Sequence, residues 1–304
     1  METAPIVVAS PFLLDRRAEW GEGFTLRMPA DVAEGQRGAI RVIATGGEKF
    51  DLGLLDLFPG VRLVACFSTG YEGIDLTELR RRSIALTTAA GVNAHDVADQ
   101  AIALFLAQWH AIIPGNETVR RGGWRAGMSP RRSLRGRRAG IVGLGRIGSA
   151  IASRLAAHEM EVRWWAPRAR PDAPWPRMES LHALAEWSDA LFIACRSDSN
   201  NAGLVDEEAI RALGPDGVLV NVSRGTLVDE AALRSSLKSG RLGGAALDVF
   251  AREPLDPADW NGIGNAVLSP HMAGYTQEAG LAMFGQLREN IRRFLAGEEL
   301  LSPE

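Results

Sequence analysis

Continuous apolar runs alternate with segments of helical spacing along most of the chain. Four such runs precede residue 90, at 6–9, 39–45, 62–68 and 84–89. Residues 50–58 and 75–82, which lie between runs, have the spacing of amphipathic helices. Strands whose apolar residues do not alternate with polar ones are typical of a parallel sheet with both faces covered. The pattern therefore predicts parallel strands joined by helices.

A second series of apolar runs begins after residue 138. Its members are AGIVGLG, EVRWWA, ALFIAC, GVLVNVS and GAALDVF. Helical patterns separate most of them, so the chain contains enough strands for a second sheet. The expected fold class is α/β, with two doubly wound parallel-sheet domains.

Two helical segments predict how the domains are joined. Residues 95–113 read as one helix with apolar residues on most of its circumference. Such a helix must be buried almost all round, between the domains or against a second copy of the chain, and we expect a homodimer. Residues 276–297 form a last amphipathic helix without a strand of its own, which predicts a return to the first domain. We therefore expect a discontinuous domain of residues 1–94 and 275–304, and a second domain of residues 95–274.

Composition narrows the class of protein. Hydrophobic residues make up 46% of the 304 residues and charged residues 23%, which is typical of a globular protein with two cores. The net charge of −3 gives no reason to expect nucleic acid or an anionic membrane as a partner. No apolar run reaches the length of a membrane span, and the first ten residues lack the basic start of a secretion signal. A cytoplasmic location is expected.

The two cysteines, Cys66 and Cys195, both lie in apolar, strand-like runs. Two cysteines cannot build a disulfide framework. We expect buried structural thiols rather than redox or metal-binding groups, and no metal site.

The strongest local motif follows the apolar run at 139–142. Gly143, Gly145 and Gly148 form a G-x-G-x-x-G motif between a predicted strand and a predicted helix. The first glycine permits a tight turn, the second lets the backbone approach a pyrophosphate, and the third brings helix and strand together. The N–H groups at the start of the helix then face the anion. We expect these glycines, with Arg146 and Ile147, to bind a dinucleotide.

The end of the next strand indicates which dinucleotide is bound. About 20 residues after the glycines, an acidic residue normally binds the adenosine ribose hydroxyls, but this position is Ala166. Arg168 and Arg170 follow it, and arginine binds a 2′-phosphate that an acid would repel. We therefore expect a preference for NADP(H), with NAD(H) possible. The alternative is that both arginines are solvated surface residues.

Six ordered blocks carry a family resemblance: FSTGYEGID, GVNAHDVADQAIAL, GIVGLGRIG, NVSRGTLVDEAAL, GAALDVFAREPL and LSPHMAG. Over nearly its whole length the sequence resembles the D-isomer-specific 2-hydroxyacid dehydrogenases, and among them the NADPH-dependent glyoxylate/hydroxypyruvate reductases. The resemblance implies a flavodoxin-like, substrate-binding first domain and a Rossmann dinucleotide-binding second domain.

The resemblance implies catalytic roles for three residues. A 2-oxo acid needs a forked cation for its carboxylate and a proton donor for its carbonyl oxygen. Arg224 of NVSRG supplies the cation, and His271 of the Pro-His pair supplies the proton. Glu253, which precedes Pro254, holds the tautomer of the imidazole and favours its charged form.

Further roles are implied for the loops around this triad. The backbone amides of Thr69 and Gly70 would bind the substrate carboxylate, and Asp248 would hold the nicotinamide carboxamide. The resemblance assigns no role to Tyr71 or Tyr275.

The function expected from these residues is NADPH-dependent reduction of a small 2-oxo acid, of the glyoxylate or hydroxypyruvate type, to the D-2-hydroxy acid. The same chemistry on hydroxyphenylpyruvate or a keto-aldonate is the nearest alternative. A non-catalytic nicotinamide sensor of the same fold is the second. Phosphoglycerate oxidation is disfavoured because no regulatory module is expected after residue 304, and Glu253 argues against the formate dehydrogenases, which lack this glutamate.

Overall fold

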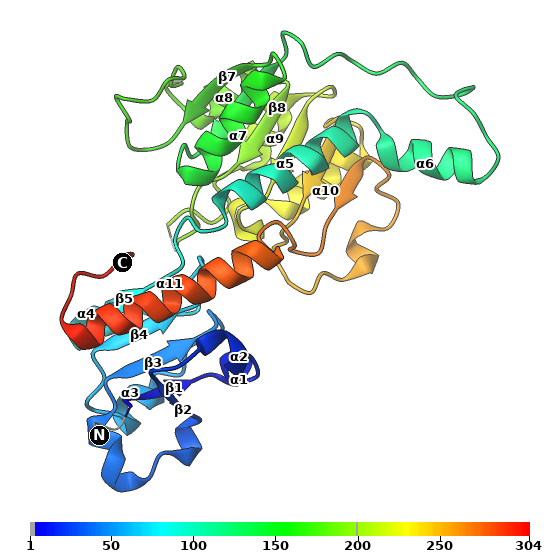
Figure 1. Ribbon diagram of the computed structural model, residues 1–304. Helices are drawn as coiled ribbons and strands as arrows, with labels where there is room; N and C mark the ends of the chain where they lie inside the picture. The colour runs from blue at the N-terminus through cyan, green and yellow to red at the C-terminus, as the bar shows by residue number, and fades with distance from the viewer. Residues whose placement is uncertain (1–3, 199) are drawn as a thin grey trace. The chain divides into compact units, whose positions relative to one another are not determined.

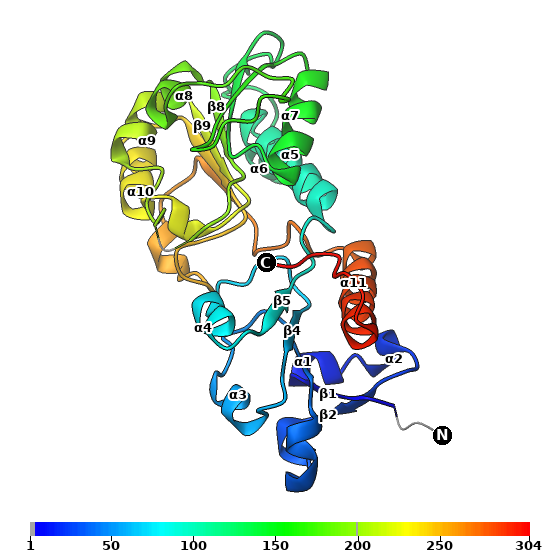
Figure 2. The ribbon, with the colours of Figure 1, turned by 90° about the vertical axis from the view of Figure 1, so that its left-hand side faces the viewer.

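The computed structural model, which describes residues 4–198 and 200–304, folds into two α/β units (Figure 1, Figure 2). The first unit comprises Met1–Asn93 with Thr276–Glu304, and the second comprises Ala94–Tyr275. Both junctions lie one residue from the positions expected from the sequence. Two parallel sheets covered by helices confirm the expected fold class, while the roles of the two domains remain a prediction.

The sheet of the first unit has five strands in the order β2-β1-β3-β4-β5, and all neighbours are parallel. The strands are β1 (Ile6–Ala9), β2 (Thr25–Arg27), β3 (Val42–Thr45), β4 (Leu63–Cys66) and β5 (Ala85–Thr87). The helices are α1 (Pro11–Leu14), α2 (Arg17–Trp20), α3 (Gly53–Leu57), α4 (Leu76–Arg81) and α11 (Gln277–Ala296), with 3-10 helices at Pro29–Asp31 and Glu34–Ala39. This strand order is that of flavodoxin-like sheets.

In the inner strands β3 and β4 every residue is buried, and successive side chains point to opposite faces of the sheet, which explains why these strands do not alternate with polar residues. On one face, Val64 belongs to a core that includes Leu55 of α3 and Leu79 of α4. On the other face, Ala65 belongs to a core that includes Phe284 of α11. The last helix thus returns to the first unit, as its amphipathic pattern predicts.

The second unit has six parallel strands in the order β11-β10-β9-β8-β6-β7. The strands are β6 (Arg138–Val142), β7 (Glu161–Trp165), β8 (Ala190–Ile193), β9 (Val218–Asn221), β10 (Gly244–Leu247) and β11 (Ala266–Leu268). The helices are α5 (Ala94–Trp109), α6 (Ile112–Arg120), α7 (Arg146–Ala157), α8 (Leu181–Trp187), α9 (Glu207–Leu213) and α10 (Glu230–Lys238), with 3-10 helices at Gly225–Leu227 and Pro257–Trp260. One core joins α5 and α7 to the sheet, and a second core joins α8, α9 and α10 to it.

The expected single helix over residues 95–113 is wrong at its carboxyl end, where the helix is broken at residues 110 and 111. Helix α5 ends at Trp109, Ala111 adopts left-handed backbone angles (φ 49°), and α6 begins at Ile112. Pro114 has no N–H for an i−4 hydrogen bond, so it interrupts a continuing helix but fits the first turn of a new one. Ile112 is 57% exposed, so the expectation of burial all round also fails beyond α5. In Figure 1, α6 extends away from the sheet of its unit.

Two edge strands, β2 and β11, were not predicted. Each has three residues and only one of them is buried. Edge strands pair on one side only and can be short, so their apolar signal is weak. The longest helix, α11, carries several arginines, and within the described ranges no helix has the length and apolar character needed to cross a bilayer.

A carboxylate before β8 ties the amino ends of the second sheet together. Asp189 is mostly buried, and it accepts hydrogen bonds from Arg132 Nη2 at 2.5 Å and from the Arg138 N–H at 2.9 Å. Burial by itself raises the pKa of Asp189, but the Arg138 N–H and the charge of Arg132 outweigh it and hold this pKa below its usual value.

We expect Asp189→Asn to lower the free energy of unfolding by about 1–3 kcal/mol at pH 7, because a hydrogen-bonded ion pair is replaced by a weaker contact. The folded-state pKa is lowered, so the stabilisation is complete above the unfolded value of ~3.9 and is lost as the pH falls through the folded value. Urea unfolding of both proteins at pH 7 and pH 3 measures the difference. Asp216→Asn is the control, because Asp216 lies 3.7 Å from Arg132 but is 85% exposed. An equal effect of the two substitutions at pH 7 would contradict the assignment.

Candidate active site

The glycine motif forms the turn between β6 and α7, and each of its glycines has a distinct steric reason. Gly143 has φ 90°, and a Cβ there would lie 2.6 Å from the Cα of Cys195. At Gly148 a Cβ would overlap the Gly143 carbonyl oxygen. At Gly145 a Cβ would meet nothing within 4 Å, so the space beside this residue is open to a ligand. The turn therefore has the shape of a pyrophosphate cradle.

The position of this turn in the sheet also fits a ligand site. Strand β6 lies between β7 and β8, where the strand order reverses direction. Open α/β sheets bind ligands at such switch points, outside the carboxyl ends of the strands. Helix α7 begins at Arg146, which is followed by Ile147. Gly145 occupies the N-cap position and has no side chain to cap the helix. The N–H groups of the first helical turn, which have no partner within the helix, are therefore available to bind an anion at this end.

Several arginines lie around the end of β7, where Ala166 replaces the acidic residue that normally binds the adenosine ribose. Arg170 donates a hydrogen bond to the carbonyl of Leu144, inside the glycine turn. Arg177, which the sequence analysis did not single out, donates from Nη2 to the carbonyl of Ala166 at 2.8 Å. Arg168 is exposed in the same loop. Arg177 could not be found from spacing, because its position depends on residues 176–178 returning beside Trp164 of β7.

The two thiols differ in their surroundings. Cys66 is buried in β4, as expected. Cys195 follows β8 and is only half-buried, so the expectation of a buried strand thiol is wrong for this residue. Burial still raises the pKa of the Cys195 thiol to about 11. A thiol with so high a pKa is protonated near neutral pH and a poor nucleophile.

Three loops that follow neighbouring strands contain the remaining candidate residues of this unit. Arg224 follows β9, Asp248 follows β10, and His271 follows β11. Backbone hydrogen bonds join the loop starts: the Asp248 N–H donates to Asn221 at 2.9 Å, and the His271 N–H donates to Asp248 at 2.9 Å. Because the strands are parallel, their carboxyl ends lie at one edge of the sheet.

The structure brings His271 and Glu253 into direct contact. His271 Nδ1 lies 2.6 Å from Glu253 Oε2, and Glu253 Oε1 accepts a hydrogen bond from the Phe250 N–H at 3.0 Å. The carboxylate is thus oriented by the backbone and in turn orients the imidazole. The contact at Nδ1 leaves Nε2 as the ring nitrogen that can exchange a proton with a ligand. The His271 backbone adopts φ 55°, an uncommon angle for a residue with a side chain.

Asp248 holds the loop that carries this histidine. It is fully buried, and its two carboxylate oxygens accept hydrogen bonds from the N–H groups of Met272 at 2.9 Å and Ala273 at 2.8 Å. These bonds stabilise the left-handed turn at His271. The contact of Asp248 with a nicotinamide remains a prediction.

Arg224 is half-buried in the loop beside the one that carries Glu253. Its Nη1 donates to the Ser223 carbonyl at 2.7 Å, and its own carbonyl accepts from Asn221 Nδ2 at 2.9 Å. The next residue, Gly225, packs so closely against the Phe250–Ala251 peptide that a Cβ there would overlap it. Asn221, which sequence reasoning missed, is the buried side chain that shapes this turn.

Thr69 and Gly70 lie in the first unit, in the loop after β4. The Gly70 carbonyl accepts a hydrogen bond from Ser68 Oγ at 2.5 Å. The loop packs against Gly47, which has φ 100° and no room for a Cβ beside Ser68. The Ala89 N–H, after β5, donates to the Ser68 carbonyl at 3.0 Å. The loop is therefore held by the ends of β3 and β5.

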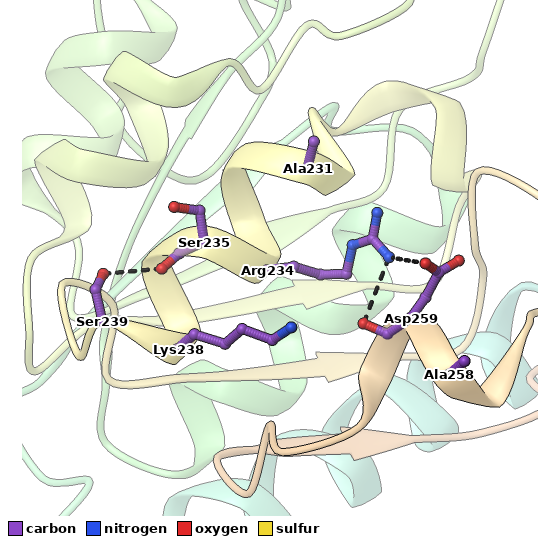
Figure 3. Close-up of a pocket in the computed structure, with 7 residues that line it drawn as sticks. All are labelled: Ala231, Arg234, Ser235, Lys238, Ser239, Ala258 and Asp259. Atoms are coloured by element: carbon purple, nitrogen blue, oxygen red, sulfur yellow. Dashed lines mark hydrogen bonds and ion pairs between the residues drawn. The ribbon is translucent and has the colours of Figure 1, made fainter.

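A surface groove elsewhere in the second unit does not involve the candidate residues. Figure 3 shows it between α10 and the 3-10 helix at Pro257–Trp260, with Arg234 turned toward Asp259. These two side chains form an ion pair at 2.6 Å. None of the residues singled out in the sequence lines this groove.

Comparisons with known proteins agree with this geometry. A family profile described as "D-isomer specific 2-hydroxyacid dehydrogenase, NAD binding domain" matches residues 102–273. The chain is 38% identical to 2-ketogluconate reductase of Gluconobacter oxydans, over 87% of this chain and 86% of that protein. It is 36% identical to hydroxyphenylpyruvate reductase of Plectranthus scutellarioides, over 95% and 93%. A solved NADPH-dependent glyoxylate/hydroxypyruvate reductase of Sinorhizobium meliloti, in complex with NADP and malonate, is 33% identical with a TM-score of 0.87, over 99% of this chain and 97% of that one.

Two glycine substitutions should separate ligand binding from folding. We expect Gly145→Ala to fold normally but to weaken NADPH binding at least tenfold, because its methyl group occupies the open space of the cradle. Gly148→Ala should lower thermal stability even without cofactor, because its methyl group collides with the Gly143 carbonyl. Thermal unfolding and NADPH fluorescence titration of both variants measure the two effects. Wild-type affinity in Gly145→Ala would show that the pyrophosphate does not approach this glycine.

Proposed function

This chain belongs to the D-isomer-specific 2-hydroxyacid dehydrogenases, and on that premise we propose that it reduces glyoxylate or hydroxypyruvate to the D-2-hydroxy acid with NADPH. Membership confirms the family resemblance and the coarser activity, that of a nicotinamide-dependent oxidoreductase acting on small 2-oxo acids. The proposal adds the substrate, the preference for NADPH and the role of each residue. It rests above all on the 2.6 Å contact between His271 Nδ1 and Glu253 Oε2.

The cofactor proposal rests on the open cradle at Gly145 and on the arginines near β7. The bound cofactor would supply the hydride that reduces the substrate carbonyl. The backbone of Gly143–Gly148 would bind its pyrophosphate. Arg168, Arg170 and Arg177 would neutralise a 2′-phosphate, since guanidinium groups pair with phosphate in a bidentate manner and the residue directly after β7 is Ala166 rather than an acid.

In this proposal Arg224 binds the substrate carboxylate. A guanidinium can form two parallel hydrogen bonds to a carboxylate, which fixes both the position and the rotation of a small acid. Asn221 supports the turn that carries Arg224. As the family resemblance implies, the amides of Thr69 and Gly70 would also bind this carboxylate.

His271 donates the proton that the reduced carbonyl oxygen requires. Glu253 orients the ring through Nδ1 and stabilises the imidazolium, so that Nε2 carries the proton to be transferred. Asp248 acts through the backbone, by holding the turn that presents the histidine. After the transfer, the neutral imidazole is reprotonated from solvent.

Other 2-oxo acids are a second candidate class, favoured by the names of two relatives, a 2-ketogluconate reductase and a hydroxyphenylpyruvate reductase. The chemistry at C2 is the same and the remainder of the substrate differs. Initial rates with glyoxylate, hydroxypyruvate, hydroxyphenylpyruvate and 2-ketogluconate, each with NADPH, rank the four by kcat/KM. Highest kcat/KM on either of the last two would overturn the proposed substrate, and turnover of none would favour a nicotinamide sensor.

Location and assembly are further parts of the proposal. We place the enzyme in the cytoplasm. We also propose a homodimer in which a second copy covers the exposed apolar side chains of α6, Ile112, Ile113 and Val119. Light scattering of the purified protein measures the mass in solution, and a monomer would contradict this part.

We expect His271→Ala to lower kcat for reduction by about 10²–10⁴, the usual contribution of a general acid. The NADPH dissociation constant should change less than threefold, because the imidazole contributes no contact to the cradle. Glu253→Gln should give a smaller loss, because Gln can still accept from Phe250 but cannot stabilise the imidazolium. Stopped-flow reduction and fluorescence titration measure rate and binding separately. Wild-type kcat in His271→Ala would remove the proton donor from the mechanism.

We expect Arg168→Gln and Arg177→Gln each to raise the dissociation constant of NADPH about 10- to 100-fold, the equivalent of one charge-assisted hydrogen bond. The dissociation constant of NADH should change little, because it lacks the 2′-phosphate. Arg211→Gln is the control, an exposed arginine on α9. Fluorescence titration with both cofactors gives the ratio. Equal losses for NADPH and NADH would show that these arginines do not read the phosphate.

A further inference from the structure

The residues after α11 add a short segment to the edge of the first sheet. Pro303 forms an antiparallel bridge with Thr87 of β5. The Thr88 N–H donates to Ser302 at 3.3 Å, and the Glu304 N–H donates to Leu86 at 3.1 Å. In Figure 2 this segment runs from α11 to β5 within the first unit. The pairing covers the otherwise open edge of β5.

Side chains of α11 fix this segment in register. Ser302 Oγ contacts the Thr88 carbonyl at 2.5 Å, Gln286 Nε2 at 3.0 Å and Asn290 Nδ2 at 3.2 Å. Asn290 also accepts from the Leu301 N–H at 2.9 Å, and it is buried. Buried polar side chains that are satisfied in this way specify one arrangement of the chain. The position of Glu304 is therefore set by the fold of the first unit.

The carboxylate of Glu304 joins the ends of two strands. Its Oε2 accepts a hydrogen bond from the Tyr71 hydroxyl at 2.9 Å, and its Oε1 accepts one from Thr88 Oγ1 at 3.0 Å. Tyr71 and Thr88 are both buried and Glu304 is half-buried, so these bonds are partly shielded from competing water. Tyr71 directly follows Gly70 in the loop after β4, and Thr88 directly follows β5. Hydrogen bonds to a charged acceptor are the strong ones, so the link is stiff.

We propose that Glu304 is a positioning residue for substrate binding. By holding Tyr71, it keeps the amides of Thr69 and Gly70 preorganised to receive the carboxylate of the 2-oxo acid, an inference that rests on the proposed function. Preorganised donors bind a ligand without the cost of ordering a loop. The groups proposed for proton transfer, His271 and Glu253, belong to the other unit. Loss of Glu304 should therefore weaken substrate binding and leave the chemical step nearly intact.

The kinetic test compares Glu304→Ala with Glu299→Ala, which removes an exposed carboxylate three residues after the end of α11. Glu304→Ala should raise KM for the best 2-oxo acid about five- to twentyfold, while kcat should stay within twofold of wild type. The effect on KM is smaller than the loss of a whole charge-assisted hydrogen bond to substrate would give, because Glu304 does not itself contact the substrate. Glu304→Gln should raise it less, because its amide oxygen still accepts from Tyr71. Glu299→Ala should behave as wild type. The NADPH dissociation constant should be unchanged in all three.

A double-mutant cycle tests whether Glu304 acts through Tyr71. Tyr71→Phe should raise KM by a factor similar to that of Glu304→Ala, and the double variant should show no further rise. A spectroscopic readout is independent of turnover, because the chain has two tyrosines. With tyrosine labelled by carbon-13 at Cζ, Glu304→Ala should shift one resonance and leave the other, identified by Tyr275→Phe, in place.

The outcomes separate the two levels of the proposal. An unmoved Tyr71 resonance, or a moved resonance with unchanged KM, overturns the positioning role while the enzyme activity stands. Additive effects of Tyr71→Phe and Glu304→Ala on KM also overturn the positioning role, because they show that Glu304 does not act through Tyr71. Equal losses in kcat and 1/KM with lowered thermal stability overturn it as well, because they indicate a general structural role for Glu304. A wild-type protein without turnover on any 2-oxo acid overturns the proposed function itself.

Discussion

Parallel pairing of the strands is the constraint on which the candidate site depends. A parallel sheet aligns the carboxyl ends of its strands at one edge, so residues that are distant in sequence become neighbours when each follows a strand. Arg224, Asp248 and His271 follow β9, β10 and β11, which are adjacent in the sheet. The Asp248 carboxylate then stabilises the turn at His271, and Glu253 orients its ring. The chemistry is thus built on loops whose starting points are fixed by the sheet.

In the proposed cofactor site of the same sheet, backbone and side chains would contact different parts of one ligand. The glycine turn is shaped by the absence of side chains, since a Cβ at Gly143 or Gly148 would collide with the backbone and one at Gly145 would fill the open cradle. The segment after β7 is shaped by side chains, because Arg170 contacts the glycine turn and Arg177 contacts the carbonyl of Ala166. Pyrophosphate is common to both nicotinamide cofactors, whereas a 2′-phosphate belongs to one. In the proposed function, the turn would therefore serve either cofactor, and the arginines would select NADPH.

The first unit contributes a different kind of preorganisation. Its loop after β4 carries no charged catalytic group, and its proposed contacts to substrate are backbone amides. Backbone amides bind a ligand well only when the backbone conformation is fixed. Three contacts restrain this loop: Gly47 packs against Ser68, the Ala89 N–H donates to the Ser68 carbonyl, and Glu304 accepts from Tyr71. The carboxylate of Glu304 is the strongest of these restraints because it is charged and both of its oxygens are engaged.

Local pattern in the sequence determined the strands with buried faces, the glycine turn, the missing acid at Ala166 and the division into two domains, because each depends on residues within a short window. The family resemblance supplied the triad residues and their expected roles. Tertiary structure alone decided the break at Ala111, the short edge strands, the half-burial of Cys195, the return of Arg177 beside Trp164 and the link from Glu304 to Tyr71. Periodicity reports which face of an element is buried, but it carries no information about which distant segment packs there. The contact of His271 with Glu253 spans only 18 residues, yet it too requires the turn that Asp248 holds, and that turn exists only in the folded sheet.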